Sequence, residues 1–343
     1  MNIDILNSVI ENRQTGFGIA ELGFLHLTPA LQSQISAKFA NINLSEFPDY
    51  ISKTTEERSN PLKLHPWAKS IIIAAIPFAC IPDLPPFLQP ASDPELSGKV
   101  AGYAIKKDYH KYGKERLAKF AEDLKKKSNC EFRTEIAIDT APVAERTLAT
   151  LAGLGRIGFN SCLLTKNNGS GCFIGEIFTD IEQFTSKEAL IDNLPAENSC
   201  SSCKKCLKNC PTGAVKNGSS FKCKICRSYL TIEKRGSLSQ KECKLVDDWI
   251  FGCDICTRSC PETNLPPPFE VDLQWLLLCP TAELKKAIKG TTLEYSGVTM
   301  LRRNALTVLK NRNTPAALNL ITKFSEITGS EMLRNFVSEI DGA

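Results

Sequence analysis

The chain has 343 residues, 42% of them hydrophobic, which is enough for two or three packed units and too apolar for a disordered protein. Its net charge of +4 is too small to make the whole molecule a polycation. No segment has the apolar length of a membrane span, and Met1-Asn2-Ile3-Asp4 starts neither a basic leader nor a twin-arginine signal. We therefore expect a cytoplasmic protein without a membrane partner.

The segment before residue 195 mixes strand and helix patterns. Residues 70–77 form a short apolar run typical of a buried strand, and the proline-rich residues 81–94 predict a surface loop. Residues 100–127 are expected to be helical, and residues 134–138 alternate like a half-buried strand that ends at Asp139. A carboxylate there suits an active site, although such aspartates more often cap turns or helices. The expected buried stripe of the helix is Tyr109, Tyr112, Leu117, Phe120 and Leu124.

Residues 153–158 read Gly-Leu-Gly-Arg-Ile-Gly and match the G-x-G-x-x-G of dinucleotide-binding loops only loosely. No apolar strand leads into the run, because residues 144–152 look helical, and residues 172–178 after it predict another strand. We therefore interpret these glycines as turn residues.

Eight cysteines between residues 200 and 260 carry the strongest chemical signal. They run Cys200-x2-Cys203-x2-Cys206-x3-Cys210-Pro211, then a lone Cys226, then Cys253-x2-Cys256-x3-Cys260-Pro261. In such runs three thiolates bind one iron–sulfur cube, and the fourth, followed by proline, reaches a second cube. Zinc sites need only paired C-x2-C motifs, and cytosolic reductants keep disulfides open. We predict two 4Fe-4S clusters that form an electron path.

The other cysteines are harder to assign. From spacing alone Cys223 is also a possible ligand, since two residues separate it from Cys226 in a C-x2-C step. Cys243 has no assignment. The rest lie in apolar or isolated contexts, and we expect them to be small buried hydrophobic residues: Cys80, Cys130, Cys162, Cys172 and Cys279.

Lysines gather between residues 106 and 127 and around the first cysteine run. A local basic face of this kind binds polyanions such as RNA. Solvated helix faces and lysines that flank a metal site explain the same pattern, and composition alone favours this second explanation.

Beyond Pro268 the pattern becomes helical. Helices are expected over residues 282–289, 298–311, 315–324 and 331–340. Short helices in antiparallel pairs are typical of HEAT-type repeats. Such a region offers a binding surface, and simple packing against the core is equally consistent with the pattern.

Several motifs along the chain together resemble one known family. The most specific are Ile138-Asp139-Thr140-Ala141-Pro142-Val143 and Cys226-Arg227-Ser228-Tyr229-Leu230-Thr231, since the cysteine runs alone occur in many ferredoxins. The others are Glu57-Arg58-Ser59-Asn60-Pro61, Pro66-Trp67-Ala68-Lys69-Ser70, Asp108-Tyr109-His110, Gly153-Leu154-Gly155, Phe173-Ile174-Gly175-Glu176-Ile177 and the Arg303-Asn304 helix. In these motifs the chain is similar to the epoxyqueuosine reductases, cobalamin-dependent enzymes that finish the queuosine modification of tRNA.

The resemblance implies an α+β protein of three domains. Residues 1–195 would form a cobalamin-binding catalytic domain with an α/β sandwich, residues 196–268 a two-cluster ferredoxin-like domain, and residues 269–343 a HEAT-like helical repeat region. It also implies cobalamin and two 4Fe-4S clusters as cofactors. The family pattern selects Cys226 over Cys223 and divides the ligands into Cys200, Cys203, Cys206 and Cys260 on one cluster, and Cys210, Cys226, Cys253 and Cys256 on the other.

The resemblance also implies roles for individual side chains. Asp139 would be the general acid above the corrin, kept protonated because burial beside an apolar ring raises its pKa. Arg58 would contact the corrin. No histidine lies in an Asp-x-His-x-x-Gly element, so we expect none to bind cobalt and His110 to be a packed helix residue. Weaker matches, for which turn and cap roles serve equally well, suggest further cofactor contacts by Asn160, Ser161, Ser228 and Thr231.

The expected function is that of an oxidoreductase, the reduction of epoxyqueuosine to queuosine in tRNA at the last step of queuosine biosynthesis. The expected partners are the tRNA anticodon arm and a reduced ferredoxin or flavodoxin-type electron donor, and the expected state is a monomer. One alternative is a small-molecule corrinoid reductase related to reductive dehalogenases, and another is a non-catalytic iron–sulfur electron carrier. The motifs around Asp139 and Arg58 argue against the carrier, and the helical tail favours tRNA.

Two stretches depart from the family pattern. Family members commonly carry Trp and Lys where this chain has Arg156 and Phe159, and Pro261-Glu262-Thr263-Asn264 replaces a shorter Pro-Trp-Asn-like stretch. The C-terminal helical region is also short. We therefore expect a contact at the corrin or tRNA edge to differ in this chain.

Overall fold

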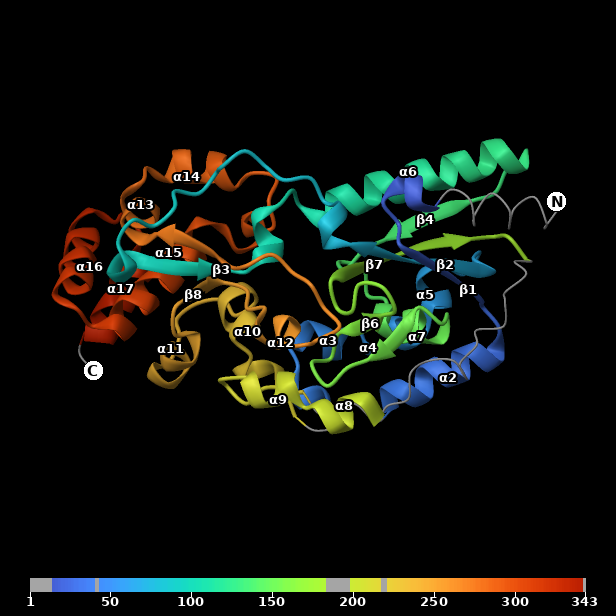
Figure 1. The fold of residues 1–343 in the computed structure, drawn as a ribbon, viewed down its shortest axis with the longest axis horizontal. Helices are drawn as coiled ribbons and strands as arrows, with labels where there is room; N and C mark the ends of the chain where they lie inside the picture. The colour runs from blue at the N-terminus through green and yellow to red at the C-terminus, as the bar shows by residue number, and fades with distance from the viewer. Residues whose placement is uncertain (1–13, 41–42, 183–197, 217–220, 342–343) are drawn as a thin grey trace.

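The computed structural model describes residues 14–40, 43–182, 198–216 and 221–341. The molecule is elongated, with a sheet toward one end and a group of helices at the other (Figure 1). The α+β class predicted from the sequence is confirmed. None of the helices within these ranges has both the length and the apolar character of a membrane span.

A four-stranded antiparallel sheet forms the centre of the N-terminal half. In spatial order its strands are β1 (Glu21–His26), β2 (Ser70–Pro77), β7 (Cys172–Thr179) and β4 (Thr134–Ala137). Nearly every residue of β2 and β7 is buried, because helices cover both faces of the sheet. The strands predicted for β2, β4 and β7 are confirmed.

One face of the sheet carries α6 (Tyr109–Ser128), and the other carries α7 (Glu145–Leu151) and α2 (Pro29–Ala40) (Figure 1). The predicted buried stripe of α6 is confirmed, with Tyr109 partly buried at its start. The helix begins later than expected because Asp108 caps it, accepting a hydrogen bond from the His110 N–H. Residues 94–105, immediately before it, form β3 (Ser97–Val100) between the 3-10 turns η4 (Pro94–Leu96) and η5 (Gly102–Ile105).

The glycine run at residues 153–158 is a tight turn. Gly153 follows α7 with a φ of 78°, and Gly155 starts β5 (Gly155–Ile157), which pairs with β6 (Leu163–Thr165). A Cβ on Gly155 would lie 2.2 Å from the carbonyl oxygen of Leu164, so only glycine fits there. The run therefore forms the turn that leads from α7 into a two-stranded β-ribbon, as the turn interpretation predicts.

The cysteine-rich segment consists of short helices. They are α8 (Asn198–Cys203), α9 (Lys205–Asn209), the 3-10 turn η7 (Cys223–Ile225), α10 (Arg227–Ile232), α11 (Gln240–Val246) and α12 (Ile255–Arg258), with β8 (Trp249–Phe251) before the last. Helix α9 packs against α12, and this contact brings the two cysteine runs together.

The C-terminal region is helical, as predicted. Its helices are α13 (Leu273–Leu278), α14 (Thr281–Ile288), α15 (Leu293–Arg312), α16 (Pro315–Ile327) and α17 (Glu331–Asp341). Helix α15 starts earlier than expected, and Gly297, with a φ of 73°, separates its first turn from the rest. The main part of α15 contacts each of the other four helices, so it is the axis of this region.

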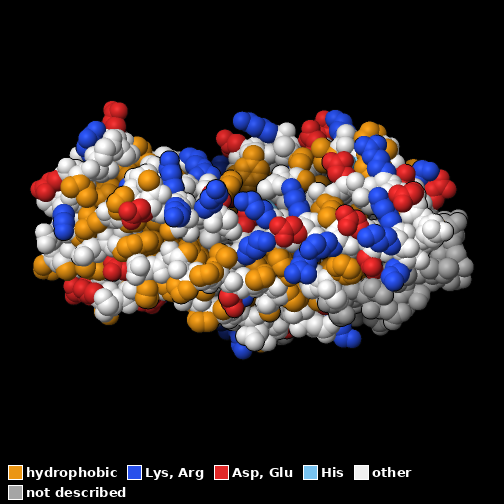
Figure 2. Space-filling view, turned by 90° about the horizontal axis from the view of Figure 1, so that it is seen from above, with side chains coloured by type: hydrophobic (Ala, Val, Ile, Leu, Met, Phe, Trp, Pro, Cys, Tyr) orange, Lys and Arg blue, Asp and Glu red, His pale blue; other side chains and the backbone are white. Residues whose placement is uncertain are grey.

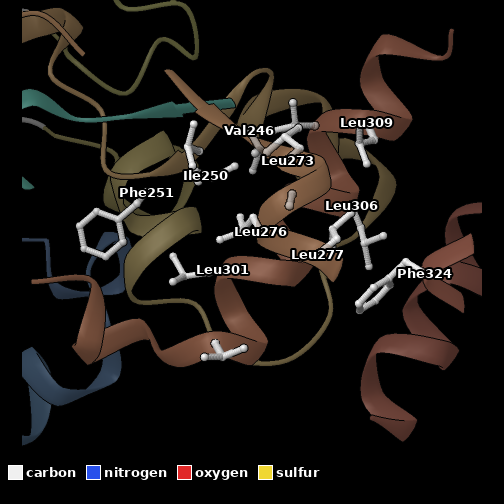
Figure 3. Packing of buried hydrophobic residues seen from close by; sticks show 14 of the residues in the cluster. Val246, Ile250, Phe251, Leu273, Leu276, Leu277, Leu301, Leu306, Leu309 and Phe324 are labelled. Carbon is white, nitrogen blue, oxygen red and sulfur yellow. The ribbon is translucent and has the colours of Figure 1, made fainter. Parts of the chain in front are cut away.

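A second sheet joins parts of the chain that the sequence assigns to different domains. Its order is β8, β3, β9 (Phe269–Asp272), with β3 parallel to β8 and antiparallel to β9. Strands β3, β8 and β9 come from the expected catalytic, cluster and helical domains, in that order. One apolar core continues from this sheet into the helices, and Figure 3 shows side chains of β8, α13 and α15 within it. Side chains from all three regions therefore pack in one apolar core.

Arg303 on α15 ties the cysteine-rich segment to the helical region. Its guanidinium is fully buried and donates hydrogen bonds to the carbonyl oxygens of Leu230 (2.7 Å), Lys234 (2.8 Å) and Gly236 (2.8 Å) and to the side chain of Asn304. Burial lowers the pKa of Arg303 to about 10, which still leaves it charged at neutral pH. Every donor that it offers is directed at an otherwise unsatisfied backbone or side-chain oxygen.

We predict that Arg303→Met destabilises the protein by about 3 kcal/mol or more, because the loss of the guanidinium leaves several buried carbonyl oxygens without a donor. Urea denaturation of the two proteins measures the difference. Lys323→Met, an exposed change on α16, is the matched control and should stay within about 0.5 kcal/mol. Equal stabilities of the Arg303 variant and the control would contradict the role given to Arg303.

Candidate active site and cysteine groups

Asp139 lies just beyond the end of β4, where the starts of α6 and α7 meet. Its backbone is left-handed, with a φ of 53°, a conformation that aspartate tolerates better than most residues. Its Oδ2 accepts a hydrogen bond from the hydroxyl of Tyr109 (2.5 Å) and lies 2.9 Å from Nε2 of His110. Its backbone N–H donates to the carboxylate of Glu145. The side chain is 54% exposed, so the carboxyl is accessible to a ligand.

His110 is bonded at both ring nitrogens. Nδ1 lies 2.7 Å from the Asp108 carboxylate, and Nε2 is the atom that meets Asp139. Two carboxylate partners require an imidazole that donates from both nitrogens, which only the charged form does. Burial by itself would lower the pKa of His110, but the hydrogen bonds and charges of the two aspartates outweigh it and raise the pKa to about 9. His110 is partly buried in the first turn of α6 and stacks on Tyr109, as expected of a packed helix residue, but its pairing with two carboxylates was not predicted.

Hydrogen bonds keep the Asp139 carboxyl in its ionised form. Burial would raise its pKa, but the bonds from His110 and Tyr109, with the positive charges of His110 and Arg146, outweigh burial and lower the pKa below its usual value. The raised pKa expected from the sequence is therefore not produced by the protein's own groups. At neutral pH the proton shared by this pair rests on His110.

Glu145 and Arg58 complete the surroundings of Asp139. Burial, together with the charge of Asp139, raises the pKa of Glu145 well above its usual range. Arg58 donates from Nη1 to the carbonyl oxygen of Val143 (3.1 Å) and from Nε to Thr54 (2.9 Å). These bonds hold its charge where it interacts electrostatically with both Asp139 and Glu145. The structure thus places Arg58 beside the predicted acid.

Asn160 and Ser161 lie in the turn after β5. Asn160 is 5% exposed, and its side-chain oxygen accepts a hydrogen bond from the N–H of Cys162 (3.2 Å). Its buried Nδ2 has no hydrogen-bond partner within the described part of the chain, so it is a donor to which a ligand could bind. Ser161 has a φ of 61°, and its carbonyl oxygen accepts a hydrogen bond from Arg146. Both residues therefore lie on the Asp139 side of the molecule.

Ser228 and Thr231 lie on α10. The Ser228 hydroxyl bonds to the side chain of Tyr103, whose interaction with Asp139 places it near the site. Thr231 is fully buried, and its hydroxyl donates to the carbonyl oxygen of Arg227 (2.9 Å) and accepts from the N–H of Gly252 (3.0 Å). This bonding matches the structural alternative for Thr231 rather than a cofactor contact.

The cysteine thiols fall into two groups. The thiol of Cys206 interacts electrostatically with those of Cys200 and Cys260. The thiol of Cys226 interacts with those of Cys210, Cys253 and Cys256. Cys203 shares α8 with Cys200, and the division of the eight cysteines between two clusters stays a prediction. Among the described residues, no three His, Cys, Asp or Glu side chains converge closely enough to hold one metal ion.

The remaining cysteines differ from the expectation in one respect. Cys80 is exposed, so the expectation of burial is wrong for this residue. Cys130, Cys162, Cys172 and Cys279 are partly buried, and all of these except Cys162 pack against an apolar core. Cys162 interacts electrostatically with Cys226 and Cys260, and Cys223 interacts with Cys226. Both lie beside the cysteine groups, and no local sequence signal placed Cys162 there. Cys243 is buried among apolar residues, in contact with the C-terminal core.

Comparison with known proteins identifies the family. Residues 58–140 match the family described as epoxyqueuosine reductase QueG, DUF1730, and residues 199–263 match the 4Fe-4S double cluster binding domain. A curated epoxyqueuosine reductase of Cyclobacterium marinum is 31% identical over 290 residues, covering 84% of this chain and 86% of that protein. The chain belongs to the epoxyqueuosine reductase family. The epoxyqueuosine reductase of Vibrio cholerae is 29% identical over 306 residues, covering 86% of this chain and 79% of its own length.

Solved epoxyqueuosine reductases share the fold. A selenomethionine-labelled epoxyqueuosine reductase superposes with a TM-score of 0.79 at 25% identity, over 99% of this chain and 91% of that one. An epoxyqueuosine reductase solved with a tRNA-Tyr epoxyqueuosine-modified stem loop gives a TM-score of 0.77 at 25% identity, over 99% and 90% of the two chains. The predicted family, oxidoreductase class and double-cluster domain are confirmed.

The two stretches expected from the sequence to depart from the family pattern contact each other. Arg156 on β5 forms an ion pair with Glu262 in the turn after the second cysteine run (2.5 Å), and it donates to the hydroxyl of Ser199 (2.9 Å). Arg156 is 9% exposed and interacts electrostatically with Cys200. Burial by itself would lower the pKa of Arg156, but Glu262 outweighs it and raises the pKa. Arg156 and Glu262 thus form a charge pair that joins the β5 ribbon to the cysteine-rich segment.

We predict that His110→Gln destabilises the fold in a pH-dependent way. Because the pKa of His110 is raised from 6.5 to about 9, its charge stabilises the folded state fully below about pH 6.5, and this contribution is lost as the pH rises through about 9. Urea denaturation should therefore show a loss of stability at pH 6 that largely disappears at pH 10. Asp108→Asn keeps the helix cap and should lower the pKa of His110 in an NMR titration. An equal loss at both pH values would refute the charged state of His110.

We predict that Cys226→Ser removes one cluster, leaving about half of the iron, whereas Cys223→Ser leaves the iron content unchanged. The two variants are matched, since both thiols lie in the same turn and interact with each other. Iron and acid-labile sulfide analysis after anaerobic reconstitution measures the result. The reverse outcome would assign Cys223 as the ligand.

Proposed function

We propose that this chain reduces epoxyqueuosine to queuosine in tRNA, with cobalamin and two 4Fe-4S clusters. The proposal rests on one observation: Asp139, His110 and Tyr109 form a hydrogen-bonded, proton-holding group in a chain of this family that also carries a double-cluster domain. Arg146 links the two regions, because it interacts electrostatically with Asp139 and with Cys162 and Cys223 beside the cysteine groups. The solved relative bound to an epoxyqueuosine-modified stem loop supports tRNA as the substrate.

Cobalamin fits the side chains present around Asp139. The buried, unpartnered Nδ2 of Asn160 and the guanidinium of Arg58 are donors suited to corrin amide or phosphate oxygens. Ser161 and Ser228 lie nearby as further polar contacts, whereas the hydroxyl of Thr231 is already bonded within the protein. When bound, cobalamin supplies the strongly reducing centre that acts on the epoxide carbon.

The protein's own residues manage the protons. Removal of the epoxide oxygen to leave an alkene consumes two electrons and two protons and releases water. Asp139 is the residue that faces the substrate, and His110 is the neighbouring group that is charged at neutral pH. Proton transfer from Nε2 of His110 to Oδ2 of Asp139 crosses a 2.9 Å contact, and the Tyr109 hydroxyl donates a hydrogen bond to the same Oδ2. Asp139 then donates to the opening oxygen.

The cysteine groups provide the route for electrons. Cys200, Cys203, Cys206 and Cys260 would hold one cluster, and Cys210, Cys226, Cys253 and Cys256 would hold the other. The two clusters would supply electrons one at a time. A reduced ferredoxin or flavodoxin-type protein is the proposed donor, and the enzyme is proposed to act as a monomer in the cytoplasm.

Binding of tRNA would use positive charge near the active site. Figure 2 looks onto the side that carries α6 and shows Lys and Arg side chains across the middle of the molecule and over this helix, with acidic groups among them. Some lysines here are paired, such as Lys107 with Glu115 (3.2 Å) and Lys111 with Glu294 (3.7 Å). The surface is therefore mixed in charge, and its unpaired cations, rather than a uniform basic patch, would contact phosphates.

The deciding experiment is Asp139→Asn. We expect this variant to retain about eight irons and one cobalt per chain after anaerobic purification with cobalamin, and to lose turnover by about a hundredfold or more, because asparagine cannot donate the proton. Conversion of tRNA carrying the epoxide nucleoside is followed by nucleoside analysis. Asp93→Asn, a change at the exposed cap of η4, is the matched control and should keep turnover. Full activity of Asp139→Asn would remove Asp139 from the mechanism, and a wild-type chain that binds clusters but no corrin would leave only an electron carrier.

A further inference from the structure

Two aromatic rings lie on the surface of the protein. Tyr295, in the first turn of α15, is 57% exposed, and Tyr50, in α3 (Asp49–Lys53), is 47% exposed. Every other Phe, Trp or Tyr side chain whose burial the structure describes is at least partly buried. A lone exposed ring is common on protein surfaces and needs no function. Tyr295 differs from such a ring because its neighbours hold it in one position.

Two neighbours fix the Tyr295 ring. Its hydroxyl donates a hydrogen bond to Oε2 of Glu233 (2.9 Å), and the guanidinium of Arg235 lies over one ring face, 4.8 Å from the centroid. Arg235 is fixed in turn, since Nη1 and Nη2 donate to the carbonyl oxygens of Ser296 and Tyr295 (3.3 Å each). Because Arg235 covers one face while more than half of the side chain is exposed, the opposite face is open to a ligand. A ring fixed before binding loses little conformational freedom when a ligand packs on it.

The turn that carries Tyr295 is attached to the start of α6. The Asp108 N–H donates to the carbonyl oxygen of Gly290 (2.9 Å), and Lys111 pairs with Glu294 (3.7 Å), the residue before Tyr295. The first two residues of α6 are the ones whose side chains bond to the active-site carboxyl. The exposed ring and the active-site carboxyl are therefore both attached to the first turn of the same helix.

The second exposed ring belongs to the same side of the molecule. Tyr50 interacts electrostatically with both Asp139 and Tyr295. The two exposed tyrosines therefore lie around the active site, and Tyr295 is the more exposed of the two.

A rigid, exposed aromatic ring in this position suits an unpaired nucleobase. Every base has a π-face that stacks on an aromatic side chain, and recognition of single-stranded RNA relies on such stacking. The guanidinium behind the ring adds positive charge, which favours a polyanionic ligand. A docked protein would bury a patch of many side chains, whereas one fixed ring between Glu233 and Arg235 matches a single base.

We propose that the open face of Tyr295 stacks on the unpaired base next to the modified nucleotide of the substrate RNA. Glu233 and Arg235 hold the ring ready for this contact. The inference rests on the proposed function and deepens it, because it names a residue that binds and positions the RNA. The role is one of binding alone, so the electron and proton balance of the reaction is unaffected.

The test is Tyr295→Leu, which keeps an apolar side chain and removes the aromatic face. We expect KM for an anticodon stem loop carrying epoxyqueuosine to rise about tenfold while kcat stays within about twofold, since the stacking is the same before and during the reaction. Tyr295→Phe keeps the face and loses only the bond to Glu233, so its KM should stay within about threefold of the wild type. Leu318→Ala, an exposed change on α16, is the remote control and should match the wild type.

Two kinetic results would overturn the proposal. One is a wild-type KM in Tyr295→Leu. The other is an unchanged KM for the RNA together with slower reduction by a protein electron donor, which would assign the ring to the donor.

Fluorescence measures the stacking without turnover. We expect the wild-type chain to quench 2-aminopurine placed next to the target nucleotide, on its 5′ side in one RNA or its 3′ side in another, and Tyr295→Leu to lose that quenching. Equal quenching by the two proteins would overturn the proposal even if the wild type converts epoxyqueuosine. If the quenching depends on Tyr295 but the wild type does not convert epoxyqueuosine, the proposed function fails while the stacking contact stands. The two failures are therefore distinguishable.

Discussion

The pairing of β7 with β2 on one side and β4 on the other is the constraint on which the active site depends. This pairing sets the register in which Ala137 lies opposite Glu176, and the chain leaves the sheet two residues later at Asp139. Because both faces of the sheet are covered, α6 and α7 start at the same edge and direct Tyr109, His110 and Glu145 toward this one carboxyl. A shift of β4 by one residue would turn every side chain of the strand to the opposite face and separate these groups.

The same arrangement determines where protons are held. Hydrogen bonds from His110 and Tyr109 stabilise the charged form of Asp139, whereas burial without a cation stabilises the neutral form of Glu176. Carboxyl groups of one chain are thereby kept in opposite states at the same pH. An acid that must donate to an epoxide oxygen gains from this, since the surrounding groups can return a proton to it after each transfer.

The cysteine-rich segment is held between the two halves by a few specific contacts. Arg303 of α15 donates hydrogen bonds to backbone carbonyl oxygens in and just after α10. The ion pair of Arg156 with Glu262 joins the segment to the β5 ribbon. The sheet of β8, β3 and β9 adds a backbone connection between the regions. Since electron transfer depends steeply on separation, such rigid links serve the function as well as the fold.

The sequence by itself determined the elements and the chemistry that depend on local pattern. Cysteine spacing predicted a double-cluster domain, hydrophobic period predicted β2, β7 and the buried stripe of α6, and the motif around Asp139 indicated an acid. Only the tertiary structure decided which groups surround that acid. Asp139 is separated from His110 by 29 residues, and Glu176 comes from β7, a later strand of the chain. No local sequence pattern predicts that these three residues lie in the same part of the fold. The charge state of each group follows from these distant neighbours and from burial, and neither is encoded in the residues that adjoin it in the chain.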